Sequence, residues 1–259
     1  YLTVIPGMIE DFIGHLKRLD AKPKPIGLIG AMADLVPKPM LKEITTLLNA
    51  PYFNTFGSTE TGNPPASANL VAIGEAPSIL SKKQNDFCEI RLVDPDDNDV
   101  PDGEPGELAI RGPSLFSGYW ANDEANKDAF RNGWFHMGDV FRRTPDGLLD
   151  FVDRVKYMIK SGGENIYPAE IEQHIMADAR IIEVAVVRKP DEKWGEVPVV
   201  FAARNDETLA KDEVIDMCRG RIANYKLPKE IHFIELDDLP RSTSGKIQRH
   251  ILEDRLKSL

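Results

Sequence analysis

The sequence predicts a fold of class α/β plus α+β, because three patterns follow one another along the chain. Helix and buried-strand patterns alternate over residues 1–62, short strands broken by turn residues fill 63–152, and strands and helices mix again beyond 153. Such changes of pattern mark separate layers or domains. We therefore expect part of a large domain over 1–155, divided into an α/β portion (1–62) and a β-barrel-like portion (63–155), and a small domain over 156–259.

The first portion carries two amphipathic helix patterns and one buried strand. Apolar residues recur along one side of 6–19, and a second helix is predicted over 39–48. The run PIGLIGA at 25–31 is typical of a buried strand with a tight exit, and a strand-like loop follows at 54–62. This order of helices and strands is typical of an α/β arrangement.

The middle portion is built of short strands. Residues 107–111 alternate as a half-buried strand should, and 122–130 favours one short helix. The segments WFHMGDVFRR and GLLDFVD form a hairpin across a Pro-Asp-Gly turn. We expect a small barrel or sandwich that packs on the α/β portion.

The stretch 153–172, DRVKYMIKSGGENIYPAEIE, is predicted to be the pivot between the two domains. A short strand is expected at 157–159, Gly162 and Gly163 permit positive φ, and Pro168 suits the first turn of a helix. Beyond this stretch the pattern predicts paired strands at 181–187 and 198–203, a helix at 212–223, a strand at 231–234 and a closing helix at 247–259.

Composition narrows the classes of partner. The net charge of −10 argues against nucleic acid or an anionic membrane as the main partner, because both reward clustered Lys and Arg. Cys88 and Cys218 cannot build a disulfide framework, so we expect a reducing compartment, the cytoplasm. No apolar run approaches the roughly 18 residues of a membrane span. The sequence does not fix the oligomeric state, and a homodimer is compatible with it.

Three motifs could carry chemistry. The loop Phe56–Glu60 combines a glycine, hydroxyls and a carboxylate, which suits magnesium and phosphate, although an ordinary polar turn is the alternative. Asp139 follows a glycine at the end of GWFHMGD and could accept hydrogen bonds from two ribose hydroxyls or cap its own turn.

The third motif is PRSTSGK at 240–246, a flexible Ser/Gly loop that presents Lys246 to developing negative charge. Its end partly mimics the phosphate-binding loop G-x-x-x-x-G-K-[ST]. The first glycine of that motif is missing, however, and Ile247 replaces the Ser or Thr, so it fails as such a loop.

Taken in order, these motifs and the stretch 153–172 resemble the adenylate-forming enzymes: acyl- and aryl-CoA synthetases, peptide-synthetase adenylation domains and luciferases. Within that superfamily the chain looks most like acid-CoA ligases of the benzoate and medium-chain type. The resemblance implies ATP, Mg²⁺ and coenzyme A as cofactors. It also implies that the partners are a small carboxylic acid, ATP or AMP, and coenzyme A.

The resemblance further implies a role for each residue of the nucleotide site. These roles are Phe56 near the adenine, Gly30 and Ala31 lining the adenine and acyl pocket, Thr59 on the α-phosphate, Glu60 on the metal, Asp139 and Arg154 on the ribose, and Lys246 as the catalytic cation. Met137 stands where the family usually has threonine, which leaves the ribose contact of Asp139 as an expectation.

On the thiol side, the resemblance implies five residues that face coenzyme A, with Gly162 and Gly163 at the pantetheine tunnel; they are Lys160, Gly162, Gly163, Trp194 and Lys229. The alternative for Trp194 is an aromatic residue at a hairpin tip that packs on a neighbour. Lys229 could equally be a plain surface charge. Lys156 is implied as the hinge about which the small domain rotates between two half-reactions.

The family's Ser/Thr/Gly-rich loop ending in Pro-Lys-Gly has no counterpart in the sequence. We therefore expect the chain to be the C-terminal portion of a ligase, inactive in adenylation by itself. The alternatives are an adenylating enzyme that loads a carrier protein, a luciferase-like oxygenase, and a truncated, non-catalytic module for nucleotide binding or protein interaction.

Overall fold

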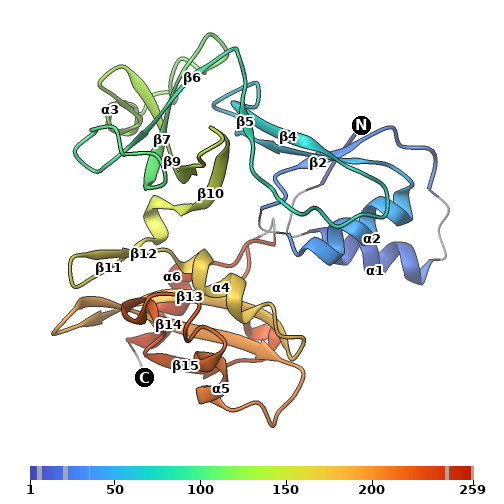
Figure 1. The fold of residues 1–259 in the computed structure, drawn as a ribbon, viewed down its shortest axis with the longest axis vertical. Helices are drawn as coiled ribbons and strands as arrows, with labels where there is room; N and C mark the ends of the chain where they lie inside the picture. The colour runs from blue at the N-terminus through green and yellow to red at the C-terminus, as the bar shows by residue number, and fades with distance from the viewer. Residues whose placement is uncertain (5–7, 20–22, 35, 243–244, 258–259) are drawn as a thin grey trace. The chain divides into compact units, whose positions relative to one another are not determined.

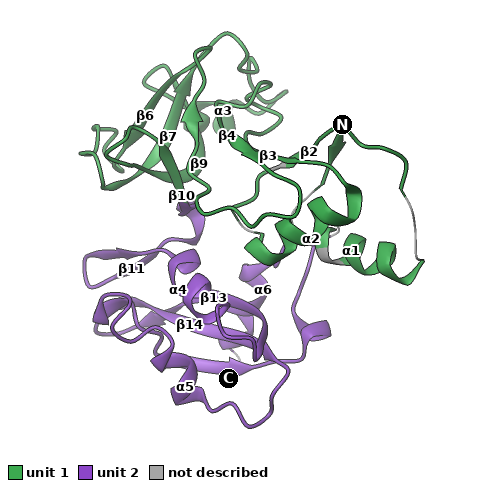
Figure 2. Ribbon diagram, turned by 45° about the vertical axis from the view of Figure 1, so that its right-hand side comes forward, with its two compact units in different colours: residues 1–151 green, residues 152–259 purple. Residues whose placement is uncertain are grey.

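A computed structural model describes residues 1–4, 8–19, 23–34, 36–242 and 245–257 (Figure 1). The chain divides into two compact units, Tyr1–Phe151 and Val152–Leu259, each with its own hydrophobic core (Figure 2). The sequence predicted a boundary at 155/156, inside the pivot stretch and four residues beyond the boundary between these units. The mixed helix and strand content of the two units confirms the α/β plus α+β fold class.

The first sheet lies in the first unit and has the order β1-β2-β3-β4-β5. Its strands are β1 (Leu2–Thr3), β2 (Ile29–Ala31), β3 (Tyr52–Phe56), β4 (Ala66–Val71) and β5 (Lys83–Gln84). The first three strands are parallel, whereas β4 and β5 add antiparallel pairs. Although the sequence placed 66–84 in the β-barrel-like portion, β4 and β5 extend the first sheet.

Two helices provide apolar side chains that pack against residues of this sheet. In α1 (Ile9–Arg18), Ile9 and Ile13 are buried four residues apart, as an amphipathic helix requires. α2 (Lys38–Leu48) has a proline in its first turn and ends at Asn49, whose φ of 47° is left-handed. The predicted helices over 6–19 and 39–48 are confirmed within the described residues.

The second sheet has the order β10-β9-β7-β6, and β8 pairs with β9. The elements are β6 (Glu89–Val93), β7 (Pro105–Arg111), α3 (Asp123–Ala129), β8 (Phe130–Arg131), β9 (Trp134–Arg143) and β10 (Leu149–Arg154). The predicted hairpin across Pro-Asp-Gly is confirmed as β9 and β10. A backbone link joins this sheet to the chain before β5, since Lys82 exchanges two backbone hydrogen bonds with Leu149 (2.9 and 2.7 Å).

The third sheet, in the second unit, has the order β12-β11-β14-β13, with β15 parallel to β14. The elements of this unit are η2 (Val155–Tyr157), β11 (Ile159–Ser161), β12 (Glu164–Ile166), α4 (Pro168–Ile175), β13 (Ile181–Asp191), β14 (Gly195–Arg204), α5 (Lys211–Asp216), η3 (Asn224–Lys226), β15 (Glu230–Phe233), η4 (Leu236–Asp238) and α6 (Arg249–Leu256). Residues 197–203 of β14 are all buried, because one face packs with α4 and α5 and the other with α6.

Two predictions of secondary structure in this unit are wrong. The expected strand at 157–159 begins only at Ile159, because Val155–Tyr157 forms a 3₁₀ turn that is closed by the Met158 N–H and the Val155 carbonyl (3.2 Å). The helix expected at 212–223 ends at Asp216. The chain then turns through Gly220 at a φ of 74°, which no α-helix accommodates.

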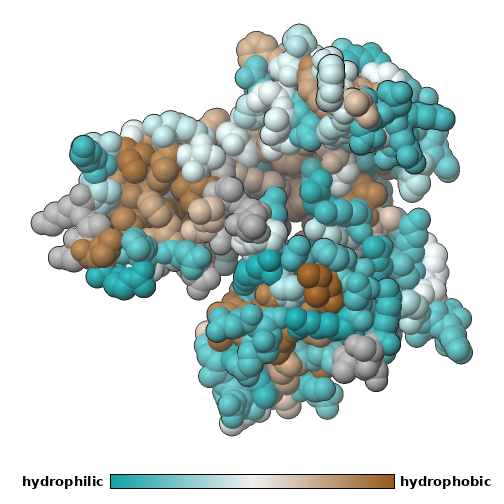
Figure 3. Space-filling view, turned by 180° about the vertical axis from the view of Figure 1, so that it is seen from behind, coloured by the Kyte–Doolittle hydropathy of each residue, from teal (hydrophilic) through white to brown (hydrophobic). Residues whose placement is uncertain are grey.

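The surface of the first unit carries large exposed apolar side chains near its first sheet. Figure 3 shows an apolar area on this part of the unit, on the left of that view. Exposed apolar residues of the segments concerned are Tyr1, Met8, Leu19, Leu70, Ile73 and Ile79. Among the helices of the described ranges, none reaches the length and hydropathy that a membrane span requires.

Candidate active site

The turn after β3 is held by a buried threonine. The Thr61 hydroxyl accepts a hydrogen bond from the Ser58 N–H and donates to the Ser58 carbonyl, both at 3.0 Å. A side chain at Gly57 would lie 3.2 Å from both the Thr61 hydroxyl and Pro64, a tight contact that favours glycine there. In this turn Thr59 is exposed and Glu60 is half-buried. The two predicted phosphate and metal residues thus sit on a braced loop that solvent reaches.

Glu60 is tied to a loop far away in the sequence. Its carbonyl accepts the Phe116 N–H (2.8 Å), and its carboxylate Oε1 accepts the Tyr119 hydroxyl (3.2 Å). The Phe116 ring packs edge-on against Tyr119 and Phe135, with centroids 4.8 and 5.2 Å apart. Sequence reasoning missed Tyr119 and Thr61. The adjacent Tyr119 and Trp120 in a loop were the available signal, because aromatic residues in a loop often have a partner to contact.

The Phe56 turn and the segment around Asp139 lie against the same apolar cluster. Phe56 packs on Phe141 with ring centroids 4.6 Å apart, and Met137 contacts the same cluster. Asp139 itself is buried. The structure therefore brings together, within the first unit, the two motifs that the sequence assigned to the phosphates and the ribose.

The remaining nucleotide-site residues of this unit lie on β2 and β3. A side chain at Gly30 would displace the exposed side chain of Tyr1, whose hydroxyl lies beside Gly30. The backbone of Ala31 pairs with that of Asn54, and the buried Asn54 accepts the Ala33 N–H at 2.8 Å. Phe56 is fully covered by the cluster just described. Their contacts with adenine stay predictions.

In the second unit, the pivot stretch is organised by a buried carboxylate and a stacked tyrosine. Asp153 accepts the backbone N–H groups of Arg154 (2.7 Å) and Ala169 (2.8 Å), and burial raises the pKa of Asp153 to about 6. Lys156, the predicted hinge, is exposed, and its ammonium lies 4.7 Å from the Tyr157 ring centroid. The Arg249 guanidinium lies 4.4 Å from the same centroid.

The loop of Lys246 is anchored on both sides by ion pairs. Arg241 pairs with Glu183 on β13, and Arg249 pairs with Glu172 on α4, both at 2.6 Å. The Ser242 N–H donates to the Lys246 carbonyl at 2.9 Å, and Gly245 has a φ of 79°. Lys246 is exposed. Thr243 and Ser244 of the predicted motif lie outside the described residues.

The residues predicted for the thiol side gather at one end of the third sheet. A side chain at Gly162 would meet the Trp194 indole at 2.8 Å, so the close approach that Gly162 permits is to Trp194. Nothing in the described part of the chain lies within 4 Å of such a side chain at Gly163. Lys160 donates its N–H to Glu196 (2.8 Å), and Lys229 donates its N–H to Pro198 (2.9 Å) at the start of β14.

Trp194 stands at the tip of the β13–β14 hairpin. The Asp191 carboxylate accepts the N–H groups of Lys193 (2.9 Å) and Trp194 (2.8 Å), which fixes the turn. The Lys193 ammonium lies 4.7 Å from the indole, which is still about two-fifths exposed. An exposed face of an indole beside an ammonium suits a negatively charged, partly aromatic ligand such as a nucleotide.

No group of three or more His, Cys, Asp or Glu side chains able to hold a metal ion occurs in the described ranges. The carboxylate of Glu60 would supply one protein ligand for a metal. This fits Mg²⁺, which is commonly held by one or two carboxylates together with phosphate oxygens and water.

The family model described as AMP-binding enzyme matches residues 1–120, and the model described as AMP-binding enzyme C-terminal domain matches residues 170–246. Together these ranges cover more than half of the chain. The chain belongs to the AMP-binding enzyme family. The predicted resemblance to adenylate-forming enzymes is thereby confirmed.

Relatives within the AMP-binding enzyme family are CoA ligases. The indoleacetate–CoA ligase of Aromatoleum aromaticum is 37% identical over 250 residues, which are 96% of this chain and 48% of the relative. The 2-succinylbenzoate–CoA ligase of Bacillus cereus is 33% identical over 264 residues, which are 100% of this chain and 52% of the relative. The chain spans about half the length of the curated relatives it matches.

A solved structure from the AMP-binding enzyme family has the same fold. It is the o-succinylbenzoate CoA synthetase of Bacillus subtilis in complex with an acyl-adenylate intermediate, with a TM-score of 0.72 and 27% identity over 95% of this chain and 54% of that one. The same enzyme in complex with ATP and a magnesium ion gives a TM-score of 0.71 at 27% identity, over 95% of this chain and 54% of that one.

Proposed function

We propose that this chain supplies the AMP-binding and lid portions of an ATP-dependent acid-CoA ligase, which forms an acyl-adenylate and then a CoA thioester. One observation carries the proposal: the Phe56–Glu60 turn and the segment of Asp139 lie against one apolar cluster of the first unit. The loop that carries Thr59 and Glu60 and the segment that carries Asp139 thus belong to the same unit and adjoin a common cluster. The names of the two relatives described above, both CoA ligases, support the same reaction.

In the first half-reaction, a carboxylate oxygen of the acid would attack the α-phosphorus of ATP, and the bond from that phosphorus to the bridging oxygen of pyrophosphate would break. Thr59 would donate its hydroxyl to an α-phosphate oxygen, and Asp139 with Arg154 would bind the ribose hydroxyls. Lys246 would bring one positive charge to the developing negative charge. Phosphoryl-type transfer depends mainly on such positioning and charge stabilisation.

Magnesium fits this arrangement at Glu60, whose half-buried carboxylate stands on an exposed loop. When bound with the nucleotide, the ion would offset part of the phosphate charge. The Tyr119 hydroxyl, which donates to Oε1 at 3.2 Å, limits the orientations open to that carboxylate.

In the second half-reaction, the thiol of coenzyme A would attack the acyl carbon, and AMP would leave with the electrons of the carbon–oxygen bond. The exposed indole of Trp194 and the ammonium groups of Lys160 and Lys229 would bind the nucleotide end of coenzyme A, whose phosphates are negatively charged. The open space above Gly163 would admit the narrow pantetheine arm. A carrier-protein phosphopantetheine, the main alternative, would not use the nucleotide contacts.

For the acid, we propose an aromatic carboxylic acid, because two relatives that span nearly all of this chain are named for indoleacetate and 2-succinylbenzoate. We also propose a reducing location, the cytoplasm. Both cysteines are free thiols, and Cys218 is buried where no partner thiol reaches it among the described residues.

Calorimetric titration of this chain with AMP tests the nucleotide site. We expect Asp139→Ala to weaken AMP binding about 10- to 100-fold, because a hydrogen bond to a charged group is worth about 1.5–3 kcal/mol. Asp146→Ala, in the exposed hairpin turn between β9 and β10, is the matched control and should bind AMP like the wild type. Equal affinity of the Asp139→Ala variant and the wild type would refute the proposed ribose contact.

Coenzyme A titrations test the thiol side in the same way. Trp194→Ala should weaken binding of coenzyme A but leave binding of pantetheine, which lacks the nucleotide, unchanged. A similar loss for both ligands would favour loading of a carrier protein over free coenzyme A.

A further inference from the structure

The segment that carries Asp139 is an interruption in a β-ladder. Between β7 and β9, Glu107 pairs with Val140 and Ala109 pairs with His136, so residues 137–139 together face Leu108 alone. Gly138 takes a φ of 74° within this bulge. A bulge removes N–H groups from the regular ladder and redirects side chains, and bulges are common beside active sites.

The side chain of Glu107 accepts the hydrogen bond of a backbone N–H group in this bulge. Its Oε1 accepts the N–H of Gly138 at 3.2 Å, one peptide before Asp139. Its Oε2 accepts the Arg131 guanidinium at 2.7 Å and lies 3.3 Å from His136 Nδ1. Burial acts to raise the pKa of Glu107, but the contacts with His136 and Arg131 outweigh it, so the pKa lies below its usual value. Glu107 is therefore a carboxylate at neutral pH.

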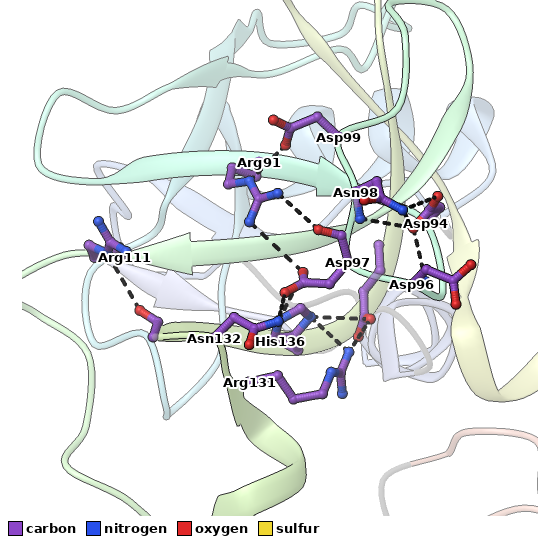
Figure 4. A network of polar contacts seen from close by, with 12 residues as sticks. Arg91, Asp94, Asp96, Asp97, Asn98, Asp99, Arg111, Arg131, Asn132 and His136 are labelled. Carbon is purple, nitrogen blue, oxygen red and sulfur yellow. Dashed lines mark hydrogen bonds and ion pairs between the residues drawn. The ribbon is translucent and has the colours of Figure 1, made fainter.

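A further layer holds the partners of Glu107 in place. Arg131 contacts His136 Nδ1 at 2.8 Å, and His136 Nε2 lies 3.7 Å from Asp97. Asp97 in turn accepts Asn132 through its carboxylate and Arg91 through its carbonyl (3.0 Å). Figure 4 shows Arg131, His136 and Asp97 pointing toward one another from separate segments. Because these groups restrain one another, the carboxylate of Glu107 has little freedom to leave the Gly138 peptide.

We propose that Glu107 is a positioning residue of the nucleotide site: it fixes the Gly138 peptide and thereby the orientation of Asp139 toward a bound ribose. The proposal rests on the proposed function of Asp139. The carboxylate of Glu107 is proposed to contact neither the nucleotide nor the reacting atoms, so Glu107 should affect AMP affinity only through Asp139.

The test compares Glu107→Ala, Glu107→Gln and the control Glu89→Gln in this chain. Glu89 lies on the neighbouring strand β6, and its side chain is 69% exposed, whereas that of Glu107 is 15% exposed. Circular dichroism and melting temperature establish that each variant folds. Should Glu107→Ala not fold, Glu107→Gln carries the test: its neutral amide accepts more weakly than a carboxylate and its NH₂ group opposes Arg131, so Gly138 exchange should still quicken, by less than in Glu107→Ala.

Two measurements are made on each variant. The first is the amide hydrogen exchange of Gly138 by NMR, which Glu107→Ala should accelerate about 10- to 100-fold, the fold-change for a lost hydrogen bond to a charged group. The second is AMP affinity by calorimetry, which Glu107→Ala should weaken by a similar factor and Glu107→Gln less. In the double variant Glu107→Ala/Asp139→Ala, AMP binding should be no weaker than in Asp139→Ala alone, because Glu107 acts through Asp139.

Unchanged Gly138 exchange in the Glu107 variants would overturn the proposal, as would faster exchange with wild-type AMP affinity. An additive loss in the double variant would also overturn it, because Glu107 would then act by another route. If wild type and Asp139→Ala bind AMP equally, the proposed function of the site fails and this proposal fails with it. That outcome is distinct from failure of Glu107 alone, in which only Asp139→Ala loses affinity.

Discussion

Replacing Lys82 with methionine should destabilise the first unit by about 3–5 kcal/mol, because it leaves Asp34 buried without its counter-ion. The Lys82 side chain is 0% exposed and that of Asp34 is 9% exposed, with Nζ and Oδ2 2.5 Å apart. Burial raises the pKa of Asp34 and lowers that of Lys82, so each group needs the other's charge to stay ionised.

The size of the effect follows from burial, and an exposed pair of the same unit supplies the comparison. Lys17 and Glu43 also form an ion pair, but their side chains are 57% and 38% exposed. Lys17→Met should therefore cost no more than about 1 kcal/mol. Lys82→Met/Asp34→Asn should cost less than the sum of its single substitutions by about 2 kcal/mol or more, since neither charge is left unpaired.

Hydrogen exchange with mass spectrometry, as a function of urea, reads the stability of the first unit separately from the second. Peptides that include Lys82 and Leu149 are decisive, because these residues exchange two backbone hydrogen bonds. If Lys82→Met costs no more than Lys17→Met, or if the double substitution loses the full sum, the pair is not the coupled buried pair inferred here.

Three further predictions concern the second unit. The pKa of Asp153 in the folded state, about 6, exceeds the usual 3.8, so protonation of Asp153 stabilises the fold below about pH 4 and this contribution is lost as pH rises through 6. In urea unfolding, the wild type should lose up to about 3 kcal/mol of stability relative to Asp153→Asn between pH 4 and 7. A stability difference between the two proteins that does not change with pH would contradict the raised pKa. Lys156→Pro fixes φ in the predicted hinge, so in the complete enzyme it should block one half-reaction and spare the other. The control Lys156→Ala should spare both. Equal loss of both half-reactions in Lys156→Pro would exclude this hinge. Gly162→Ala should displace the Trp194 indole, alter its fluorescence and cost about 1–2 kcal/mol of stability beyond the backbone strain of a positive φ. Gly163→Ala has a similarly positive φ but open space around the new side chain, so it should leave the fluorescence unchanged. Identical spectra for the two variants would show that Trp194 does not pack on Gly162.

The elements that the sequence predicted well are those that local pattern determines. The helix predicted over 6–19, Pro168 in a first helical turn and the strand predicted at 198–203 correspond to observed elements. Helix and strand periods are set by neighbours in the chain, so they are readable without knowledge of the fold. The turn at Gly162 and Gly163 is readable for the same reason, since both take positive φ.

The features that the sequence could not predict depend on partners far away in the chain. Lys82 stands beside Lys83, and lysine is usually a surface residue, yet its side chain is buried in an ion pair with Asp34. Glu107 belongs to an ordinary alternating strand, and only the register with β9 places it at the Gly138 peptide. The motif of Asp139 was visible, but the bulge that holds it was not, because strand register is a property of two segments together.

The loop of Lys246 and the turn of Trp194, both in the second unit, are each held by a residue of the same strand, β13. Glu183, near one end of β13, anchors the Lys246 loop through Arg241, whereas Asp191, at the other end, fixes the turn of Trp194. About eight residues separate these anchors, which at ~3.3 Å per residue is roughly 26 Å of strand. The entry proposed for the pantetheine arm, at Gly163, lies at the Trp194 end of this strand, because the Gly162 N–H donates to the Trp194 carbonyl (2.7 Å). A reacting centre is only a few ångströms across, so one orientation of a rigid unit does not bring both Lys246 and this entry to it. The two proposed half-reactions therefore require the unit to turn, and Lys156 is an exposed residue in a short turn at the start of this unit.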